Sequence, residues 1–145
     1  MITTPPDYLV AFAVALWSSL HGGSSPSPHR MREIEAVADD VAYTDGSTFE
    51  DLELMNIAAW ESGYSRSARG PLGEKGPFQQ LGGAYDAEHP AREALRRLRA
   101  QGIYGFMGCS ARSTRCEEMA SRRTFPAVLY LSAFPLDEEI LAEDP

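Results

Sequence analysis

The sequence is poor in the residues that bind metals or form disulfide bridges. Its 145 residues include two cysteines and three histidines, with no Cys-x-x-Cys pair and no metal-ligand spacing among the histidines. We therefore expect no structural metal and no cofactor. Cys109 and Cys116 stand seven positions apart. A disulfide that closes this short loop and two free thiols are both compatible with that spacing.

The sequence also lacks a long hydrophobic run. The longest apolar segment, from Tyr8 to Trp17, falls short of the roughly 20 residues that span a bilayer. No basic residue precedes it, since the first arginine is Arg30, and no small-residue cleavage site follows it. These features are untypical of a signal peptide. We expect neither a membrane span nor a recognisable leader, so the delivery route of the protein stays open.

This N-terminal segment, residues 1–23, is instead predicted to form a buried helix. Pro5-Pro6-Asp7 is typical of a helix start with Asp7 as N-cap, and Gly22-Gly23 is typical of a helix end. A strand is the competing interpretation, because the run is rich in β-branched and aromatic residues. Its length and its caps favour the helix.

Charge is unevenly distributed along the chain. The net charge of −8 hides an acidic first part, residues 1–65, and a basic middle part, residues 66–123, followed by an acidic tail over residues 135–145. An acidic total argues against a general nucleic-acid binder. The basic middle part, with Arg92, Arg96 and Arg99 as one stripe, either meets an anionic polymer or forms a solvated surface.

Hydrophobic spacing predicts a single, mainly α domain over residues 1–145, with five or six helices. Ser47 and Glu50 form a capping box that starts one of these helices, and Gly63 ends it. Between residues 65 and 84, five glycines and two prolines predict a long ordered loop or a small hairpin. The other helices are expected at Met31–Tyr43, Ala91–Gln101, Ser113–Arg123 and Ala127–Phe134, with a strand as the alternative for the last.

Glu61 lies on an apolar helix face, one turn after Ile57 and Ala58. A carboxyl group that loses water on such a face is favoured in its protonated form. A protonated glutamate is the proton donor that cleavage of a glycosidic bond requires. The alternative is that Glu61 is a terminal helix residue that reaches solvent.

The surrounding motif resembles that of the lysozyme-like lytic transglycosylases and goose-type lysozymes. Their pattern is Glu-Ser-Gly-aromatic at a helix end, then a loop, then Gly-x-x-Gly-x-x-Gln. Glu61-Ser62-Gly63-Tyr64 matches the first part, and the later family positions are occupied by Ala68, Gly73, Gly76 and Gln79. The 18 positions from Glu61 to Gln79 are the usual family spacing. Pro77-Phe78 replaces the more common Leu-Met, and the resemblance covers Met55 to Gly83.

The resemblance implies a lysozyme-like fold and cleavage of the β-1,4 bond between N-acetylmuramic acid and N-acetylglucosamine in peptidoglycan. Glu61 is then the general acid and later the base, and a transglycosylase releases a 1,6-anhydro sugar. If a second carboxylate holds a water, the enzyme is a muramidase that hydrolyses the same bond. Glu74 is the candidate for that role, with a solvated partner of Lys75 as the alternative.

The resemblance also suggests which residues contact the sugar chain. Ser62 and Gln79 are expected to form hydrogen bonds, and several aromatic residues to present ring faces. The expected substrate-binding residues are Ser62, Tyr64, Phe78, Gln79, Tyr85 and Tyr104. The family's Ala-Tyr-Asn is not found, and Gly83-Ala84-Tyr85-Asp86 is the nearest string.

This departure keeps a rival open, a non-catalytic wall-binding or structural module that belongs to a phage tail or a secretion machine. In either case the expected place of action is the periplasm or the cell exterior.

Overall fold

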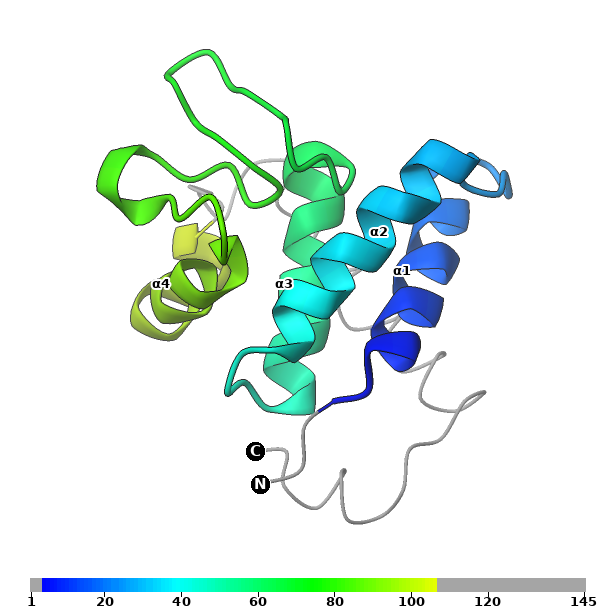
Figure 1. Ribbon diagram of the computed structural model, residues 1–145, viewed down its shortest axis with the longest axis horizontal. Coiled ribbons are helices and arrows are strands. Elements are labelled where there is room, and N and C mark those ends of the chain that lie inside the picture. The colour runs from blue at the N-terminus through cyan, green and yellow to red at the C-terminus, as the bar shows by residue number, and fades with distance from the viewer. Residues whose placement is uncertain (1–3, 107–145) are drawn as a thin grey trace.

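The computed structural model describes residues 4–106, and this part of the chain is mainly helical (Figure 1). Its helices are α1 (Pro6–Leu20), α2 (Pro28–Ala42), α3 (Thr48–Ser62) and α4 (Pro90–Phe106), with a 3-10 turn at Gly82–Ala84. Within residues 4–106 there is no β-strand, so the prediction of a mainly α chain is confirmed there. None of the helices in this range is both long and apolar enough to cross a membrane.

Several predictions lie outside the described residues. They are the last two expected helices, the acidic tail over residues 135–145, and the pair Cys109 and Cys116. Residues 4–106 contain four α-helices, and the remaining helices of the predicted five or six lie outside this range.

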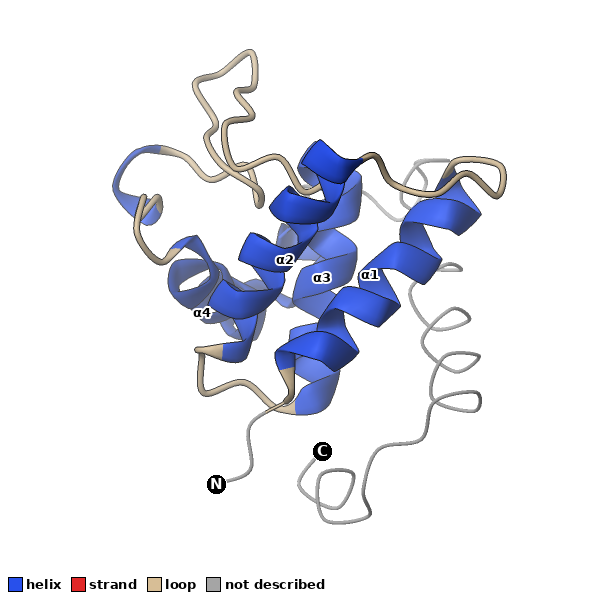
Figure 2. Cartoon of the chain, turned by 45° about the vertical axis from the view of Figure 1, so that its right-hand side comes forward, coloured by secondary structure: helices blue, strands red, loops and turns tan. Residues whose placement is uncertain are grey.

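α3 packs against α1, α2 and α4. Figure 1 shows it with α2 and α1 on one side and α4 on the other, and Figure 2 shows the same helices from a view turned by 45°. Its buried apolar residues spread around most of its circumference, as expected of a helix inside the core: Leu52, Leu54, Met55, Ile57 and Ala58. Burying an aliphatic side chain of this size stabilises the fold by about 1.5–3 kcal/mol before the entropy cost. The packing of α3 in the core thus fixes the position of its C-terminal end, which carries Glu61 and Ser62.

The predicted capping box of α3 is confirmed. The backbone N–H of Glu50 donates to Ser47 Oγ at 3.2 Å, and the N–H of Ser47 donates to Glu50 Oε1 at 3.0 Å. α2 begins three residues earlier than the predicted Met31, at Pro28. Ser27 Oγ accepts the N–H of Arg30 at 3.1 Å, and proline fits the first helical position because it needs no N–H partner there.

α1 forms the expected buried helix, with Leu9, Phe12 and Leu16 in the core. The prediction of Asp7 as its N-cap is wrong, because the helix already begins at Pro6 and Pro5 occupies the cap position. The fixed φ of proline suits the first turn, so the helix extends one residue beyond the expected polar cap. Asp7 lies inside that first turn, where a carboxylate interacts favourably with the helix dipole.

α4 is interrupted at Gly102, where the predicted helix ends. Gly102 has φ 68° and ψ 174°, which are non-helical values, and helical turns then resume as far as Phe106. Residues 103–106, which the sequence left outside any expected helix, are therefore helical. Arg97, before the kink, contacts Phe106, after it. The guanidinium of Arg97 lies 4.5 Å from the ring centre of Phe106 and donates to the Phe106 carbonyl at 2.8 Å.

Candidate functional site at the end of α3

The C-terminal end of α3 carries Glu61 and Ser62, both half-buried. Gly63 ends the helix in the left-handed conformation, with φ 61°. The N–H of Gly63 donates to the Ala59 carbonyl at 3.1 Å, and the N–H of Tyr64 donates to the Ala58 carbonyl at 3.2 Å. These two bonds satisfy the last carbonyls of the helix, and they turn the chain sharply away from Glu61.

Ser62 connects this helix end to the later half of the motif. Its Oγ lies 2.7 Å from the carbonyl oxygen of Pro77 and 3.1 Å from that of Ala58. It also accepts the N–H of Ser65 at 3.2 Å. The Ser62 hydroxyl, which was expected to meet the sugar, is therefore used to hold the turn Gly76–Gln79 beside Glu61. It positions the site from within the protein.

The segment from 65 to 81 is an ordered loop with hairpin-like pairing. Isolated antiparallel bridges join Lys75 to Gln80 and Arg69 to Lys75. Lys75 and Gln80 exchange both backbone hydrogen bonds, at 2.9 and 3.0 Å. The N–H of Gly76 donates to the Ala68 carbonyl at 3.0 Å. Figure 1 shows this loop projecting beyond the end of α3.

Glycine is required at position 76 of this loop. Gly76 has φ +79°, and a Cβ added there would lie 2.6 Å from Cε1 of Tyr85. The ring of Tyr85 therefore packs directly against the turn that Ser62 holds. Two of the expected site residues, Ser62 and Tyr85, thus both lie against the turn Gly76–Gln79.

Gln79 and Glu74 make hydrogen bonds within the loop. Gln79 has φ 49°, and its Nε2 donates to the Gly76 carbonyl at 2.9 Å. Oε1 of Glu74 accepts the N–H of Leu72 at 2.8 Å. A Cβ added at Gly70 would meet both side chains, so the two lie over the same stretch of backbone. The carboxylate of Glu74 thus stabilises its own loop.

Tyr64 and Phe78 are core residues, with exposed fractions of 0% and 1%. Burial raises the pKa of the Tyr64 phenol well above its usual range, so this hydroxyl stays protonated. Neither ring presents a face to solvent, and we leave both out of the proposed set of sugar contacts. Tyr104 lies in the last part of α4, and its side chain is outside the described residues.

Buried polar groups without a hydrogen-bond partner concentrate in this motif. Among the described residues, they include the side-chain amides of Asn56 and Gln80 and the hydroxyl of Tyr64, all at most 1% exposed. Native proteins leave few such groups unpaired, and those that remain often mark functional or strained sites. All three lie between residues 56 and 80, the stretch that contains Glu61.

Two arginines support the site and were not singled out from the sequence. Arg30 Nη1 donates to the Gly63 carbonyl at 2.6 Å, and its guanidinium lies 5.1 Å from the ring centre of Trp17. Nε of Arg66 donates to Oε2 of Glu33 at 2.6 Å. Burial alone would raise the pKa of Glu33, but its bonds to Arg66 lower it overall. Both contacts join positions 33 apart, so no local pattern indicates them.

A small cavity of about 160 Å³ opens beside the turn. Pro77, Tyr85 and Arg66 line it on the loop side, and Val37 and Asp40 line it from α2. Burial raises the pKa of the Asp40 carboxyl, although the N–H of Ala91 and the ring of His89 both favour its charged form. Glu61 is not among the lining residues.

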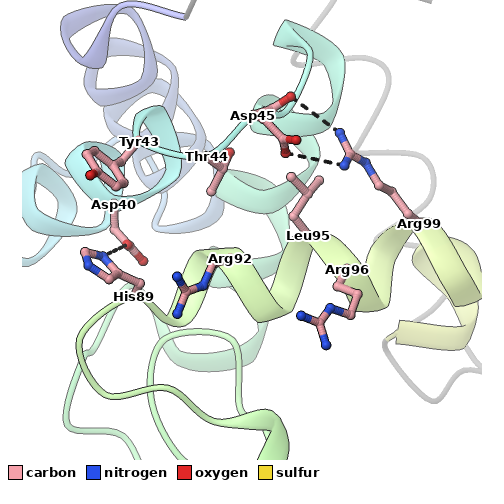
Figure 3. Close-up of a pocket in the computed structure, with 9 residues that line it drawn as sticks. All are labelled: Asp40, Tyr43, Thr44, Asp45, His89, Arg92, Leu95, Arg96 and Arg99. Carbon is pink, nitrogen blue, oxygen red and sulfur yellow. Dashed lines mark hydrogen bonds and ion pairs between the residues drawn. The ribbon is translucent and has the colours of Figure 1, made fainter.

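A larger cavity of about 410 Å³ lies between α2 and α4, and we call it the α2–α4 groove (Figure 3). Its lining includes Tyr43, Asp45, His89, Arg92, Leu95 and Arg96.

Within residues 4–106, no three or more His, Cys, Asp and Glu side chains gather closely enough to hold a metal ion.

No protein-family model matches the sequence, and neither a curated protein nor a solved structure is significantly similar to the chain.

Proposed function

We propose that the protein is a lytic transglycosylase that cleaves the β-1,4 bond between N-acetylmuramic acid and N-acetylglucosamine in peptidoglycan. The observation that carries this proposal is the 2.7 Å hydrogen bond between Ser62 Oγ and the Pro77 carbonyl. It brings together two sequence-distant halves of the motif, the helix end with Glu61 and the turn Gly76–Gln79. Contact between these halves is what a catalytic role for Glu61 requires.

The proposed reaction uses Glu61 twice. As an acid, it donates its proton to the glycosidic oxygen while the bond to C1 of the muramyl ring breaks. The substrate's own N-acetyl oxygen attacks C1 and holds the positive charge. The Glu61 carboxylate then accepts the proton of the muramyl 6-hydroxyl, whose oxygen bonds to C1 and displaces the N-acetyl oxygen. The product is a 1,6-anhydro sugar, and no water is consumed.

Glu61 is half-buried at the end of α3, next to Ser62, whose hydroxyl holds the turn. Ser62 acts as a positioning residue for the turn. Tyr85 lines the cavity beside that turn and is the proposed aromatic contact for a sugar ring. Gln79, which is half-buried, presents its amide at the same turn.

Hydrolysis of the same bond is a less supported alternative. It needs a second carboxylate that holds a water, and Glu74 was the candidate. Because Oε1 of Glu74 accepts the N–H of Leu72, this carboxylate serves the loop conformation instead. We therefore assign Glu74 no catalytic step.

A second candidate function is a glycan-binding module without turnover. The observation that favours it is a departure of the sequence from the family pattern, since the chain lacks the family's Ala-Tyr-Asn. A Glu61→Gln variant separates the two functions. An enzyme loses its wall-cleaving activity with this change, whereas a binding module cleaves nothing before or after it and retains glycan binding in both forms.

A further inference from the structure

The α2–α4 groove is distinct from the α3 end. Its lining comes from the C-terminal part of α2, the turn that follows, and one face of α4 (Figure 3). Neither Glu61 nor Ser62 belongs to it. At about 410 Å³ it is large enough for a small ligand or for part of a polymer chain.

Tyr43 forms an exposed, supported aromatic platform at the edge of this groove. It is 80% exposed, unusually high for so large a hydrophobic side chain. One face of its ring stacks on His89, with ring centres 5.4 Å apart and planes 10° from parallel. His89 is in turn held by Asp40, with Nδ1 3.5 Å from Oδ1. The stacked arrangement leaves a flat apolar surface on which another ring can pack.

Two guanidinium groups border the same groove with hydrogen-bond donors to spare. Nη2 of Arg92 contacts Asp86 Oδ2 at 2.7 Å, and Nη2 of Arg96 contacts Glu93 Oε1 at 3.2 Å. Each guanidinium has five N–H donors. The two side chains are 64% and 76% exposed. They stand four positions apart on α4 and therefore share one face, where both can meet one anionic group.

The groove also contains hydrogen-bond acceptors, and these narrow the class of ligand. Asp45 is 70% exposed, and its Oδ1 accepts from Nη1 of Arg99 at 3.4 Å, which leaves its Oδ2 as an acceptor. A carboxylate accepts hydrogen bonds from hydroxyl groups. The combination of a ring platform, three lining arginines and an exposed carboxylate matches a ligand with rings, hydroxyl groups and negative charges.

We infer that the α2–α4 groove binds an acidic sugar chain, with one pyranose ring on Tyr43 and a ring carboxylate on Arg92 and Arg96. Asp45 accepts hydrogen bonds from the sugar hydroxyls. Single-stranded DNA also combines rings with negative charge, but inside the chain it has no free hydroxyl group for Asp45 to bind. This site is independent of the proposed cleavage, because Glu61 lies outside it.

Isothermal titration with oligogalacturonate, whose every ring carries a carboxylate, tests the inference. A neutral chito-oligosaccharide of the same length and a single-stranded oligothymidylate serve as comparison ligands. We expect oligogalacturonate to bind more tightly than either, and its affinity to fall with added salt. Equal binding of the neutral sugar, or tighter binding of the oligonucleotide, overturns the inference.

Variants locate the binding. Tyr43→Ala and Arg96→Gln should each weaken oligogalacturonate binding about tenfold, while Tyr43→Phe retains it because the ring remains. Arg32→Gln is the matched control, since Arg32 is exposed on α2 and outside the groove. Glu61→Gln should bind like the wild type, so failure of the cleavage proposal leaves this result intact. Wild-type affinity in both Tyr43→Ala and Arg96→Gln contradicts the inference.

Discussion

Ser62 and Pro77 are joined by a hydrogen bond of 2.7 Å across fifteen positions of the chain, from a serine hydroxyl to a backbone carbonyl. The bond anchors the loop after α3 to the end of that helix. Pro77 is itself buried, so its carbonyl has little access to water as a replacement partner.

The first prediction concerns this bond. Ser62→Ala removes the donor and leaves the Pro77 carbonyl buried and unpaired, so the free energy of unfolding should fall by about 1–3 kcal/mol. Urea denaturation measures the change. Ser24→Ala, at an exposed position between α1 and α2, is the control and should leave the midpoint unchanged. A Ser62→Ala variant as stable as the wild type would show that the bond does not anchor the loop.

The second prediction concerns the contact between Gly76 and Tyr85. Gly76→Ala and Gly73→Ala both place an L-residue at positive φ, +79° and +87°, which costs about 1–2 kcal/mol. Only the Cβ at position 76 meets a side chain, since nothing lies within 4 Å of a Cβ at position 73. Gly76→Ala should therefore be the more destabilising change in thermal melts.

Replacing the ring checks the cause of that difference. When Tyr85→Ala is added to both glycine variants, the losses of stability caused by Gly76→Ala and Gly73→Ala should become similar. The atom that collides with the new methyl group is then absent. Equal costs for Gly76→Ala and Gly73→Ala with Tyr85 in place would refute the close packing.

The third prediction is a pair of opposite pH dependences. The folded-state pKa of Glu33 is lowered below 4.5, so the folded state binds fewer protons than the unfolded state in the window below that value. Its stabilising contribution is present above pH 4.5 and is lost as the pH falls through the folded pKa. Glu33→Gln should therefore flatten the loss of stability on acidification.

The contribution of Asp40 to the pH dependence of stability has the opposite sign. Its folded-state pKa is raised above 3.8, so the folded state binds more protons in the window above that value. Stability contributed by this group decreases as the pH rises from 3.8 through the raised pKa. Asp40→Asn should remove that decrease. Urea unfolding at a series of acidic pH values measures both variants, and slopes of the same sign for Asp40 and Glu33 would contradict the assignment.

Local signals in the sequence were sufficient for the start and end of α3. The Ser47–Glu50 capping box and the left-handed Gly63 involve residues at most a few positions apart, so their spacing alone specifies the geometry. The same local logic indicated a break at Gly102, but not the helical turns after it. Asp7 was a plausible N-cap by type, yet Pro6 extended α1 past it.

Contacts between distant positions could not be predicted in this way. Asp40 Oδ2 accepts the N–H of Ala91 across 51 positions and so caps α4 from α2. Arg30 reaches the Gly63 carbonyl across 33 positions. Motif spacing identified Tyr64 as an aromatic residue near Glu61, but spacing carries no information on whether its ring points inward. The ring of Tyr64 points inward and is 0% exposed, and its burial depends on how all the helices pack.

The most direct test of the proposed function is mass spectrometry of the fragments released from purified peptidoglycan by the wild type and by Glu61→Gln. Loss of a general acid reduces the rate about 100-fold or more. Glu35→Gln, at an exposed position on α2, is the matched control, and circular dichroism checks that each variant is folded. We predict 1,6-anhydro products, one water lighter than hydrolysed ends, from the wild type and Glu35→Gln, and almost none from Glu61→Gln. Equal release of fragments by the wild type and a folded Glu61→Gln variant would contradict the central claim.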